Sequence, residues 1–382
     1  MLRFLTAGES HGPGLTTIIE GLPAGLPVDS DTIASELARR RLGFGRGPRM
    51  KLERDELEIL GGVRFGKTLG APVSVLIRNT EWDKWSTEMT PGPGQSQRPA
   101  TAPRPGHADL AGMQKYDTHD ARDILERASA RETAARTVAG TLAKELLAAV
   151  DISVLSHVVA VGTVQAPEGE LPTLEDLAAI DESPVRAFSA EGAEAMIAEI
   201  QAAKADRDTL GGVVEVVAHG VMPGLGSHVH FDRRLDARLA EALMSIQAIK
   251  AVEIGDGLAS AARRGSDAHD EISYDDGFVR DTNRAGGIEG GMSMGGVIRA
   301  RAAMKPLSNL MRALKTVDVD SKQPEKAIRE RSDVCAVPAA AVVAEQMVAI
   351  VLAQEVQRKF GGDTVEDLVA AVDHYRKRLT RF

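Results

Sequence analysis

Two histidines lie in short glycine-containing segments that could present them to a ligand. Ser10 and His11 occur in the sequence GESHG at residues 8–12, and His107 occurs in RPGHADL, three residues after Arg104. An imidazole titrates near neutral pH and can protonate a leaving anion, and an arginine beside it can bind that anion through two hydrogen bonds. The pattern therefore predicts acid–base chemistry on an anionic ligand, with His11 as a proton donor and Arg104 as an anion-binding group.

Two other interpretations of the histidines fit the sequence less well. A hydrolytic serine is expected in a GxSxG turn, whereas Ser10 and His11 stand in the order E-S-H, and adjacent residues rarely reach the Ser–His geometry. His228 and His230 would share one face of a strand and could suggest a metal site. No third ligand with a recognisable spacing accompanies them, and HEXXH, CXXC and Walker A patterns are absent, so we expect no metal.

The second chemical feature is a basic segment in an acidic chain. The formal net charge is −9, yet residues 39–51 (RRRLGFGRGPRMK) carry six basic side chains and no acid. Arginine dominates the segment, and arginine suits bidentate contacts with phosphate and carboxylate. An acidic chain with 3% aromatic residues is a poor nucleic-acid binder, so we predict a local pocket for a small anion instead. The candidate anion-binding residues are Arg40, Arg46, Arg49, Arg104 and Arg131.

A glycine-rich run between Arg284 and Arg301 is the third feature. The sequence RAGGIEGGMSMGGVIRAR places six glycines between residues 286 and 296. Such a cluster persists where positive φ is needed or where a ligand lies against bare peptide groups. A flexible loop is the alternative, but the neighbouring apolar residues Ile288 and Val297 indicate a packed segment. We expect a backbone surface that meets a ligand.

Composition limits the class of protein. The chain has 382 residues, of which 43% are hydrophobic, and a single cysteine, Cys335, so it can build a large core without disulfides. We expect a cytoplasmic protein, because no secretory leader pattern is present at the N-terminus. The most apolar stretch, Val337 to Ala353, is interrupted by Glu345 and Gln346 and predicts a buried helix instead of a membrane span.

Hydrophobic periodicity predicts an α+β fold, because strands and helices do not alternate strictly. Apolar, β-branched runs predict strands at Leu15–Glu20, Pro72–Arg78, Ile152–Val161, Gly212–Ala218 and Val297–Ala303. Helical patterns cover Asp31–Arg41, Asp120–Val150, Asp232–Ile249 and Pro338–Phe360.

Two segments lie outside this pattern. Residues Asn79–His107 are rich in Pro, Gly, Ser and Thr, and a structureless connection of this length in a compact domain is usually a lid or a linker. Because the segment ends in Arg104 and His107, we expect an active-site lid. The acidic, alanine-rich stretch Gln165–Ala205 is expected to be a peripheral excursion without chemistry.

Taken together, the motifs resemble the chorismate synthase family over nearly the whole chain. The resemblance rests on GESHG at 8–12, RRRLGFGRG at 39–47, RPGHADL at 104–110, RASARETAAR at 127–136, GSHVHFDRRLDARL at 226–239, SIQAIKAVEIGDG at 245–257, the glycine run followed by KPLSN at 305–309, and RSDVCAVPAA at 331–340.

The resemblance implies a fold and a reaction. The fold would be one large domain over residues 1–382, a β-α-β sandwich with helices packed between antiparallel sheets, assembled as a homotetramer. The reaction would be that of a lyase, which converts 5-enolpyruvylshikimate 3-phosphate to chorismate by anti-1,4 loss of phosphate and a proton, with reduced FMN and no net redox change. NADPH or an external flavin reductase would supply the reduced flavin.

The resemblance also implies roles for individual residues. His11 falls at the position of the proton donor to the departing phosphate, and His107 at that of the residue that protonates reduced flavin. Asp333 matches an aspartate that helps the flavin N5 take the substrate proton, and Ser10 and Ser129 match its supporting hydroxyls. One departure is Ser332, which stands where the family often has histidine, so a titratable group is missing there.

Flavin contacts carry over to a larger set, with the glycine run forming one wall of the flavin site. Arg40 and Arg46 match positions that meet NADP, although binding of the substrate anions explains them equally well. A flavin-free phosphoryl-transfer enzyme is the enzymatic alternative, and the absence of a P-loop argues against it. The expected flavin contacts are Arg127, Ala128, Ser129, Gln247, Ala248, Gly290, Lys305, Pro306, Leu307, Ser308, Asn309 and Arg331.

Overall fold

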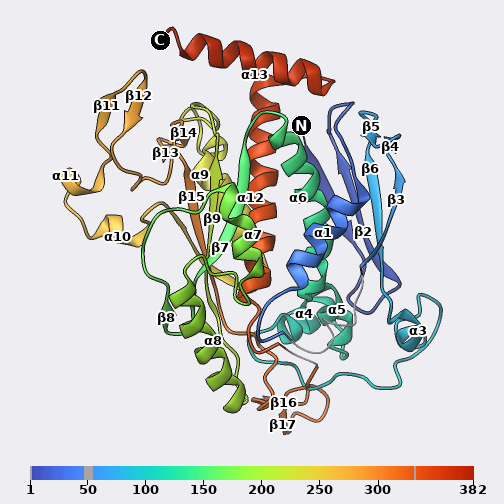
Figure 1. The fold of residues 1–382 in the computed structure, drawn as a ribbon. Helices are drawn as coiled ribbons and strands as arrows, with labels where there is room; N and C mark the ends of the chain where they lie inside the picture. Colours follow the sequence, from blue (N-terminus) through green and yellow to red (C-terminus); the bar gives the residue numbers. More distant parts are fainter. Residues whose placement is uncertain (1, 47–54, 331–332) are drawn as a thin grey trace.

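Two antiparallel sheets lie on either side of a layer of helices (Figure 1). The structure is a computed structural model that describes residues 2–46, 55–330 and 333–382. The first sheet has the strand order β1 (Arg3–Ala7), β2 (Gly14–Glu20), β6 (Val73–Arg78), β3 (Glu56–Gly61). The second has the order β10 (Ile249–Ile254), β15 (Ile298–Met304), β9 (Gly212–His219), β7 (Ser153–Val161), β8 (Val164–Gln165). The helices between them are α1 (Ser30–Arg41), α6 (Thr133–Ala148) and α12 (Val337–Phe360). The expected α+β sandwich is confirmed.

Alternation along the strands fixes which face of the first sheet is buried. Leu15 and Ile19 of β2 are fully buried, whereas Ile18 between them is exposed. The register pairs Leu15 with Ile77 and Ile19 with Val73 of β6, so apolar side chains from both strands point toward α6. A shift of one residue would turn this apolar row to solvent, and the pattern therefore specifies the register.

Helix α12 is the centre of the core. Pro338 stands in its first turn, and Gly361 follows its last residue with φ 68°. The helix is long and apolar enough to cross a bilayer, but its most apolar 18-residue window is 94% buried within the protein. It packs closely on α6, because a Cβ added to Gly140 would lie 2.3 Å from Cβ of Gln346. Glycine at this position allows the close approach of the two helices.

The prediction of one continuous helix over Asp120–Val150 is wrong, because the helix is interrupted at Ser129. Helix α5 (Arg122–Ala128) ends there, a 3₁₀ turn follows at Ala130–Glu132, and α6 then begins at Thr133. Ser129 has extended backbone angles, φ −63° and ψ 140°, and its hydroxyl accepts the backbone N–H of Arg131. A serine cap of this kind competes with the helical hydrogen bond. The break turns Ser129 and Arg131 toward one end of the helical layer.

Most other predicted elements are confirmed to within a residue or two. The predicted helix Asp232–Ile249 is shorter, because α9 spans Leu235–Met244 and Ile249 already begins β10. The remaining elements are β4 (Val63–Arg64), β5 (Lys67–Thr68), α3 (Trp82–Trp85), α4 (Asp109–Tyr116), α7 (Leu177–Glu182), α8 (Ala190–Ala205), α10 (Leu258–Ala261), α11 (Gly265–Ala268), β11 (Ile272–Tyr274), β12 (Phe278–Arg280), β13 (Ile288–Glu289), β14 (Met292–Ser293), β16 (Lys315–Val317), β17 (Pro324–Lys326) and α13 (Val365–Leu379), with short 3₁₀ turns at Leu174–Asp176 and Phe231–Arg233.

Arg39, one of the basic residues of α1, belongs to a buried ionic cluster in the core and does not face the solvent. Glu345 of α12 is fully buried and accepts hydrogen bonds from Arg39 at 2.8 Å and Lys144 at 2.7 Å. Arg186, from the stretch expected to be peripheral, is 1% exposed and pairs with Asp181 beside this cluster. Burial disfavours the charge on Glu345, but Lys144 and Arg39 outweigh it and hold its pKa well below the usual range. Part of Gln165–Ala205 is thus core structure.

Candidate active site

A cavity of about 1050 Å³ lies at the end of the helical layer where the loops converge. Its wall combines the Ser10–His11 turn, the end of α1, the segment around α3, and the α5–α6 break. The segment before β10, the chain after β15 and the first turns of α12 complete it. Segments far apart in the sequence therefore meet at one end of the molecule, near α4 and α5 in Figure 1.

Most of the predicted site residues line this cavity. Arg127 does not, because its guanidinium binds the carbonyls of Thr6 and Gly8 at 2.8 and 3.1 Å. Arg49, Arg331 and Ser332 lie outside the described residues. The predicted residues that line the cavity are Ser10, His11, Arg40, Arg46, Arg104, His107, Ala128, Ser129, Arg131, Gln247, Ala248, Lys305, Pro306, Leu307, Ser308, Asn309 and Asp333.

The glycine run does not border the cavity, contrary to the expectation that it forms a wall of the flavin site. Gly290 lies in the turn of the β13–β14 hairpin, and the cavity lining includes no residue between 284 and 301. Two of the glycines are required by chain packing: a Cβ on Gly286 would lie 2.3 Å from the backbone nitrogen of Gly255, and one on Gly287 would lie 2.5 Å from the carbonyl of Val297. Close approach is required, but between backbone and backbone.

His11 is held by a buried carboxylate on α5. Its Nδ1 lies 2.9 Å from Oε1 of Glu126, and its backbone N–H donates to Oε2 of the same carboxylate at 2.8 Å. Arg122 donates to Oε1 of Glu126 at 2.7 Å. Burial disfavours the charge on Glu126, but the contacts with His11 and Arg122 outweigh it and lower its pKa. The carboxylate is therefore ionised at neutral pH.

An aromatic side chain from the Asn79–His107 segment covers His11. The Trp85 ring lies 4.1 Å from the His11 ring, centroid to centroid, with an interplanar angle of 31°. The Arg122 guanidinium lies 4.9 Å from the centre of the Trp85 ring, within cation–π range. The segment predicted to be a lid thus contacts both the candidate proton donor and the arginine behind it.

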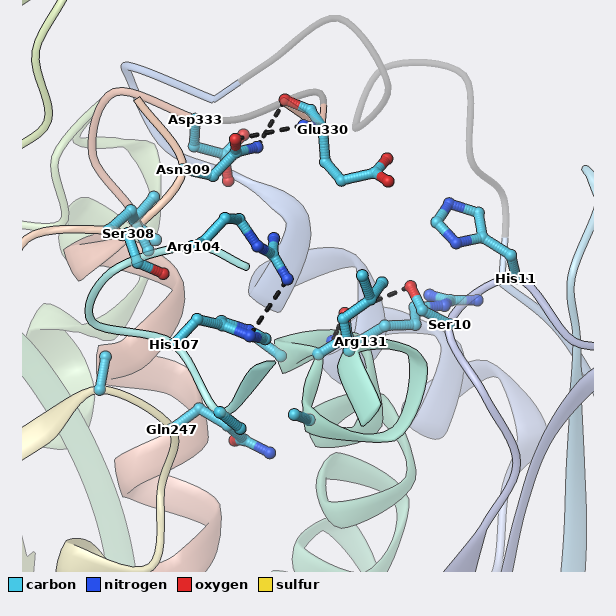
Figure 2. A pocket seen from close by; sticks show the side chains of 18 of the residues that line it. Ser10, His11, Arg104, His107, Arg131, Gln247, Ser308, Asn309, Glu330 and Asp333 are labelled. Atoms are coloured by element: carbon cyan, nitrogen blue, oxygen red, sulfur yellow. Dashed lines mark hydrogen bonds between the residues drawn. The ribbon is translucent and has the colours of Figure 1, made fainter. Parts of the chain in front are cut away.

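His107 lies across the cavity from His11 (Figure 2), and Asp109 holds its ring. Asp109 is fully buried, binds Nδ1 of His107, and accepts a hydrogen bond from Nε of Arg104 at 2.8 Å. An Arg104 NH2 group lies 3.1 Å from Nδ1 of His107. Burial opposes the charge on Asp109, but the hydrogen bonds from His107 and Arg104 hold its pKa well below the usual range.

The cavity arginines and hydroxyls are also fixed by neighbours. Arg131 donates to Asp55 at 2.5 Å and to Asn79 at 3.2 Å. Arg46 pairs with Asp333 at 3.0 Å, so two predicted site residues contact each other. The hydroxyls of Ser10 and Ser129 lie 3.2 Å apart, and Arg40, which is 4% exposed, donates to Thr133 at 3.3 Å. These contacts fix the site geometry before a ligand binds.

The cavity is basic although the chain is acidic. Among the described residues that line it, eight are Arg or Lys and four are Asp or Glu, whereas the whole chain carries −9. The N-terminal ends of α6 and α12 also reach it, at Thr133 and Ala336, and their peptide dipoles favour negative charge. A concave site with this charge attracts a small polyanion.

Several lining or supporting residues were missed in the sequence. Asp109 stands two residues after His107 within RPGHADL and could have been found from that spacing. Glu126 has no local pattern that links it to His11, because 115 residues separate them. Trp85 lay in the predicted lid without an assigned role. Other missed lining residues include Arg98, Arg122, Thr133 and Glu330.

The fold and the cavity define the class: an α+β enzyme with two carboxylate-held histidines in a basic active site. A family model described as chorismate synthase matches residues 2–357. The chain is 61% identical over 375 residues to chorismate synthase from Acidothermus cellulolyticus, with 96% of each chain covered. It is 58% identical over 390 residues to that from Thermobifida fusca, with 99% of each covered. A crystal structure of chorismate synthase, 41% identical, matches with a TM-score of 0.81 over 100% of this chain and 99% of the other. The chain belongs to the chorismate synthase family, and it is an enzyme of the lyase class.

Proposed function

We propose that this enzyme converts 5-enolpyruvylshikimate 3-phosphate to chorismate and phosphate by anti-1,4-elimination, the last step of the shikimate pathway. The observation that carries the proposal is the basic cavity with His11 and His107 on its opposite sides, in a chain of the chorismate synthase family. The substrate has one phosphate and two carboxylates, which match a wall rich in arginine. The phosphate leaves as an anion, and that departure requires a proton donor.

The cavity residues fit reduced FMN. The volume lies just above the usual range for one bound organic ligand and leaves room for a flavin and a substrate together. Oε1 of Gln247 is buried without a hydrogen-bond partner among the described residues, and such an acceptor suits a ring N–H. The residues that would hold the cofactor are Ala128, Ser129, Gln247, Ala248 and Lys305–Asn309. When bound, reduced FMN would supply transient electron density that helps the C–O bond break.

We assign proton donation to the leaving phosphate to His11. Nδ1 of its ring is engaged by Glu126, so the proton that reaches the phosphate is assigned to Nε2. Ser10 precedes His11 in the chain, its hydroxyl lies 3.2 Å from that of Ser129, and both hydroxyls are assigned to support the same region. Arg40 and Arg131 are assigned to the anionic groups of the substrate, because both line the cavity near the α5–α6 break. NADP is the alternative ligand of Arg40 and Arg46.

We assign His107 and Asp333 to the flavin side of the site. His107 lies between Arg104 and Asp109 and can hold a proton near the reduced cofactor. Asp333 is held by Arg46 and is assigned to the step that removes the substrate proton. Family membership supports a cytoplasmic homotetramer in which NADPH or an external flavin reductase provides the reduced flavin.

We further propose that Asn79–His107 acts as a lid. Apart from the four-residue helix α3, it has no helix or strand, and it contributes Trp85, Arg98 and Arg104 to the cavity wall. Ordering of this segment would exclude water from the reaction. Hydrogen exchange in residues 79–107 should slow when substrate and FMN are added together, and unchanged exchange would reject the lid.

The reaction itself is tested under anaerobic conditions. Purified enzyme, substrate and chemically reduced FMN should yield chorismate and phosphate in equal amounts, with no net oxidation of the flavin. Product formation without flavin would contradict the proposed mechanism and favour a flavin-free enzyme. A parallel reaction with oxidised FMN and NADPH alone distinguishes self-reduction from dependence on an external reductase.

A further inference from the structure

Glu126 contacts the Ser10–His11 turn through its backbone carbonyl and through both carboxylate oxygens. Its backbone carbonyl accepts the N–H of Ser10 at 3.0 Å, one carboxylate oxygen accepts the N–H of His11, and the other lies 2.9 Å from Nδ1 of the His11 ring. The side chain of Glu126 is 1% exposed. One residue of α5 therefore fixes the position of the turn and the orientation of the ring.

Charged side chains surround the contact between His11 and Glu126. Arg122 bridges two carboxylates, Glu126 at 2.7 Å and Glu330 at 2.9 Å, so its single positive charge does not neutralise both of them. Arg122 also lies near Glu88, whose carboxylate is hydrogen-bonded to Ser96. Lys84 and Glu81, which line the cavity from the same segment, pair with each other at 3.0 Å.

The contact of Glu126 with Nδ1 leaves Nε2 of His11 to donate the proton. A histidine that acts as a general acid must carry a proton on the nitrogen that faces the leaving group, and its other nitrogen must remain protonated after the transfer. A carboxylate at Nδ1 provides this, because it accepts Nδ1–H in both protonation states and stabilises the positive charge before the transfer. During the step, Nε2 loses its proton to a phosphate oxygen and the ring becomes neutral.

We propose that Glu126 is a positioning residue for His11, which fixes the ring with Nδ1–H toward the carboxylate and holds the charge of the proton-donating state. This role rests on the proposed function of His11. Glu126 does not touch the substrate; it acts through the imidazole.

Two substitutions separate the charge from the hydrogen bonds. Glu126→Gln removes the charge, and an amide oxygen at the position of Oε2 can still accept hydrogen bonds from both the backbone N–H and Nδ1–H of His11, because Oε2 lies 2.8 Å from the first nitrogen and 3.0 Å from the second. We expect kcat to fall about 10²-fold while KM changes less than about threefold. We also expect the alkaline limb of the kcat–pH profile to move toward lower pH, because the negative charge that faces the proton-donating state is lost. Glu126→Asp keeps the charge and should retain the wild-type position of that limb with a lower kcat.

A matched control lies in the same turn. Glu9 is two residues from His11 and is also acidic, but no hydrogen bond joins its carboxylate to the His11 ring in the described structure. Glu9→Gln should leave the limb in place. If Glu126→Gln and Glu9→Gln both reproduce the wild-type profile, Glu126 has no positioning role.

Nitrogen NMR of the resting enzyme tests the contact between Glu126 and His11 without a measurement of turnover. Protein labelled with ¹⁵N-histidine should show a protonated Nδ1 for His11, assigned by its loss in His11→Asn, and the fraction of His11 protonated at Nδ1 should fall in Glu126→Gln. An identical Nδ1-protonated fraction in both proteins would overturn the inference. If wild-type enzyme forms no chorismate, the proposed function fails, yet this measurement still reports on Glu126. Should Glu126→Gln not fold, Glu126→Asp carries the test: its shorter side chain should lower the Nδ1-protonated fraction, and an unchanged fraction would overturn the inference.

Discussion

A buried carboxylate contacts Nδ1 of each cavity histidine, but it comes from a neighbouring residue in one case and from a distant residue in the other. His107, Arg104 and Asp109 lie within six residues, so one short segment supplies the ring, the carboxylate and the arginine. His11 receives its carboxylate from Glu126 on another element, 115 residues away, and its cover from Trp85. The local site is a property of one short segment, the end of a loop and the first residue of α4. The distant one exists only when the first sheet and α5 are packed together, so it is sensitive to the tertiary structure.

The largest expected effect comes from removal of either ring. His11→Ala and His107→Ala should each lower turnover by about 10²–10⁴-fold, the range for loss of a general acid, with modest loss of FMN affinity. Single-turnover kinetics with reduced FMN, together with flavin titration, measure both quantities. Near wild-type turnover in one variant would remove that histidine from the mechanism and leave the other as the sole acid.

The next effect tests whether the local site fails as a unit. Asp109→Asn weakens the contacts with both His107 and Arg104, so we expect kcat to fall about 10–10²-fold and KM to rise, since the anion-binding arginine also moves. Glu126→Gln is expected to change kcat mainly. A variant of Asp109 that changes kcat alone would show that Arg104 keeps its position without the carboxylate.

The same substitution predicts a pH dependence of stability. The folded-state pKa of Asp109 is lowered from its ordinary value of 3.8, so its ionised form stabilises the folded protein above that pH, and the contribution is lost as the pH falls below it. The difference in free energy of unfolding between wild type and Asp109→Asn should be about 2–3 kcal/mol at pH 7 and shrink below about pH 4. Urea denaturation at several pH values measures it. A constant difference would assign the loss to packing.

The contrast between the two sites also shows what the sequence could predict. Periodicity located most of the strands and the buried helix α12, because one-sided burial leaves a regular pattern. It could not separate Arg39 from Arg40, since adjacent residues of α1 point to different surroundings: Arg39 to Glu345 in the core and Arg40 to the cavity. It also missed the break at Ser129, where a serine cap interrupts an otherwise helical pattern.

The site residues were predicted as separate motifs, and their spatial relations came only with the fold. The pair formed by Arg46 and Asp333 joins residues that the sequence assigned to different tasks. The glycine run shows the opposite failure. Its composition indicated a ligand-binding surface, but backbone packing against Gly255 and Val297 accounts for Gly286 and Gly287. A glycine-rich composition indicates that some group packs closely against the backbone, but it does not show whether that group is a ligand or another part of the chain.

A smaller effect is expected from the tryptophan that covers His11. Trp85→Ala should lower kcat about tenfold and raise KM, because the ring that restrains His11 and contacts Arg122 is lost. Trp82 lies in the same short helix but does not line the cavity, so Trp82→Ala is the matched control and should change turnover less than about twofold. Equal effects of the two substitutions would assign the loss to α3 as a whole, and the stacked ring would then have no particular role.

The smallest functional effect is expected from the β13–β14 hairpin, which was predicted from the sequence to contact the flavin. Gly290 has φ 57° with no atom within 4 Å of an added Cβ, so Gly290→Ala costs only the left-handed backbone strain of about 1 kcal/mol. FMN affinity and kcat should be unchanged, because the residue lies outside the cavity. Gly287→Ala, whose Cβ would meet the carbonyl of Val297 at 2.5 Å, should unfold at a clearly lower temperature. A large loss of FMN affinity in Gly290→Ala would show that the hairpin reaches a flavin after all, and because one chain does not bring it to its own cavity, the contact would have to come from another copy.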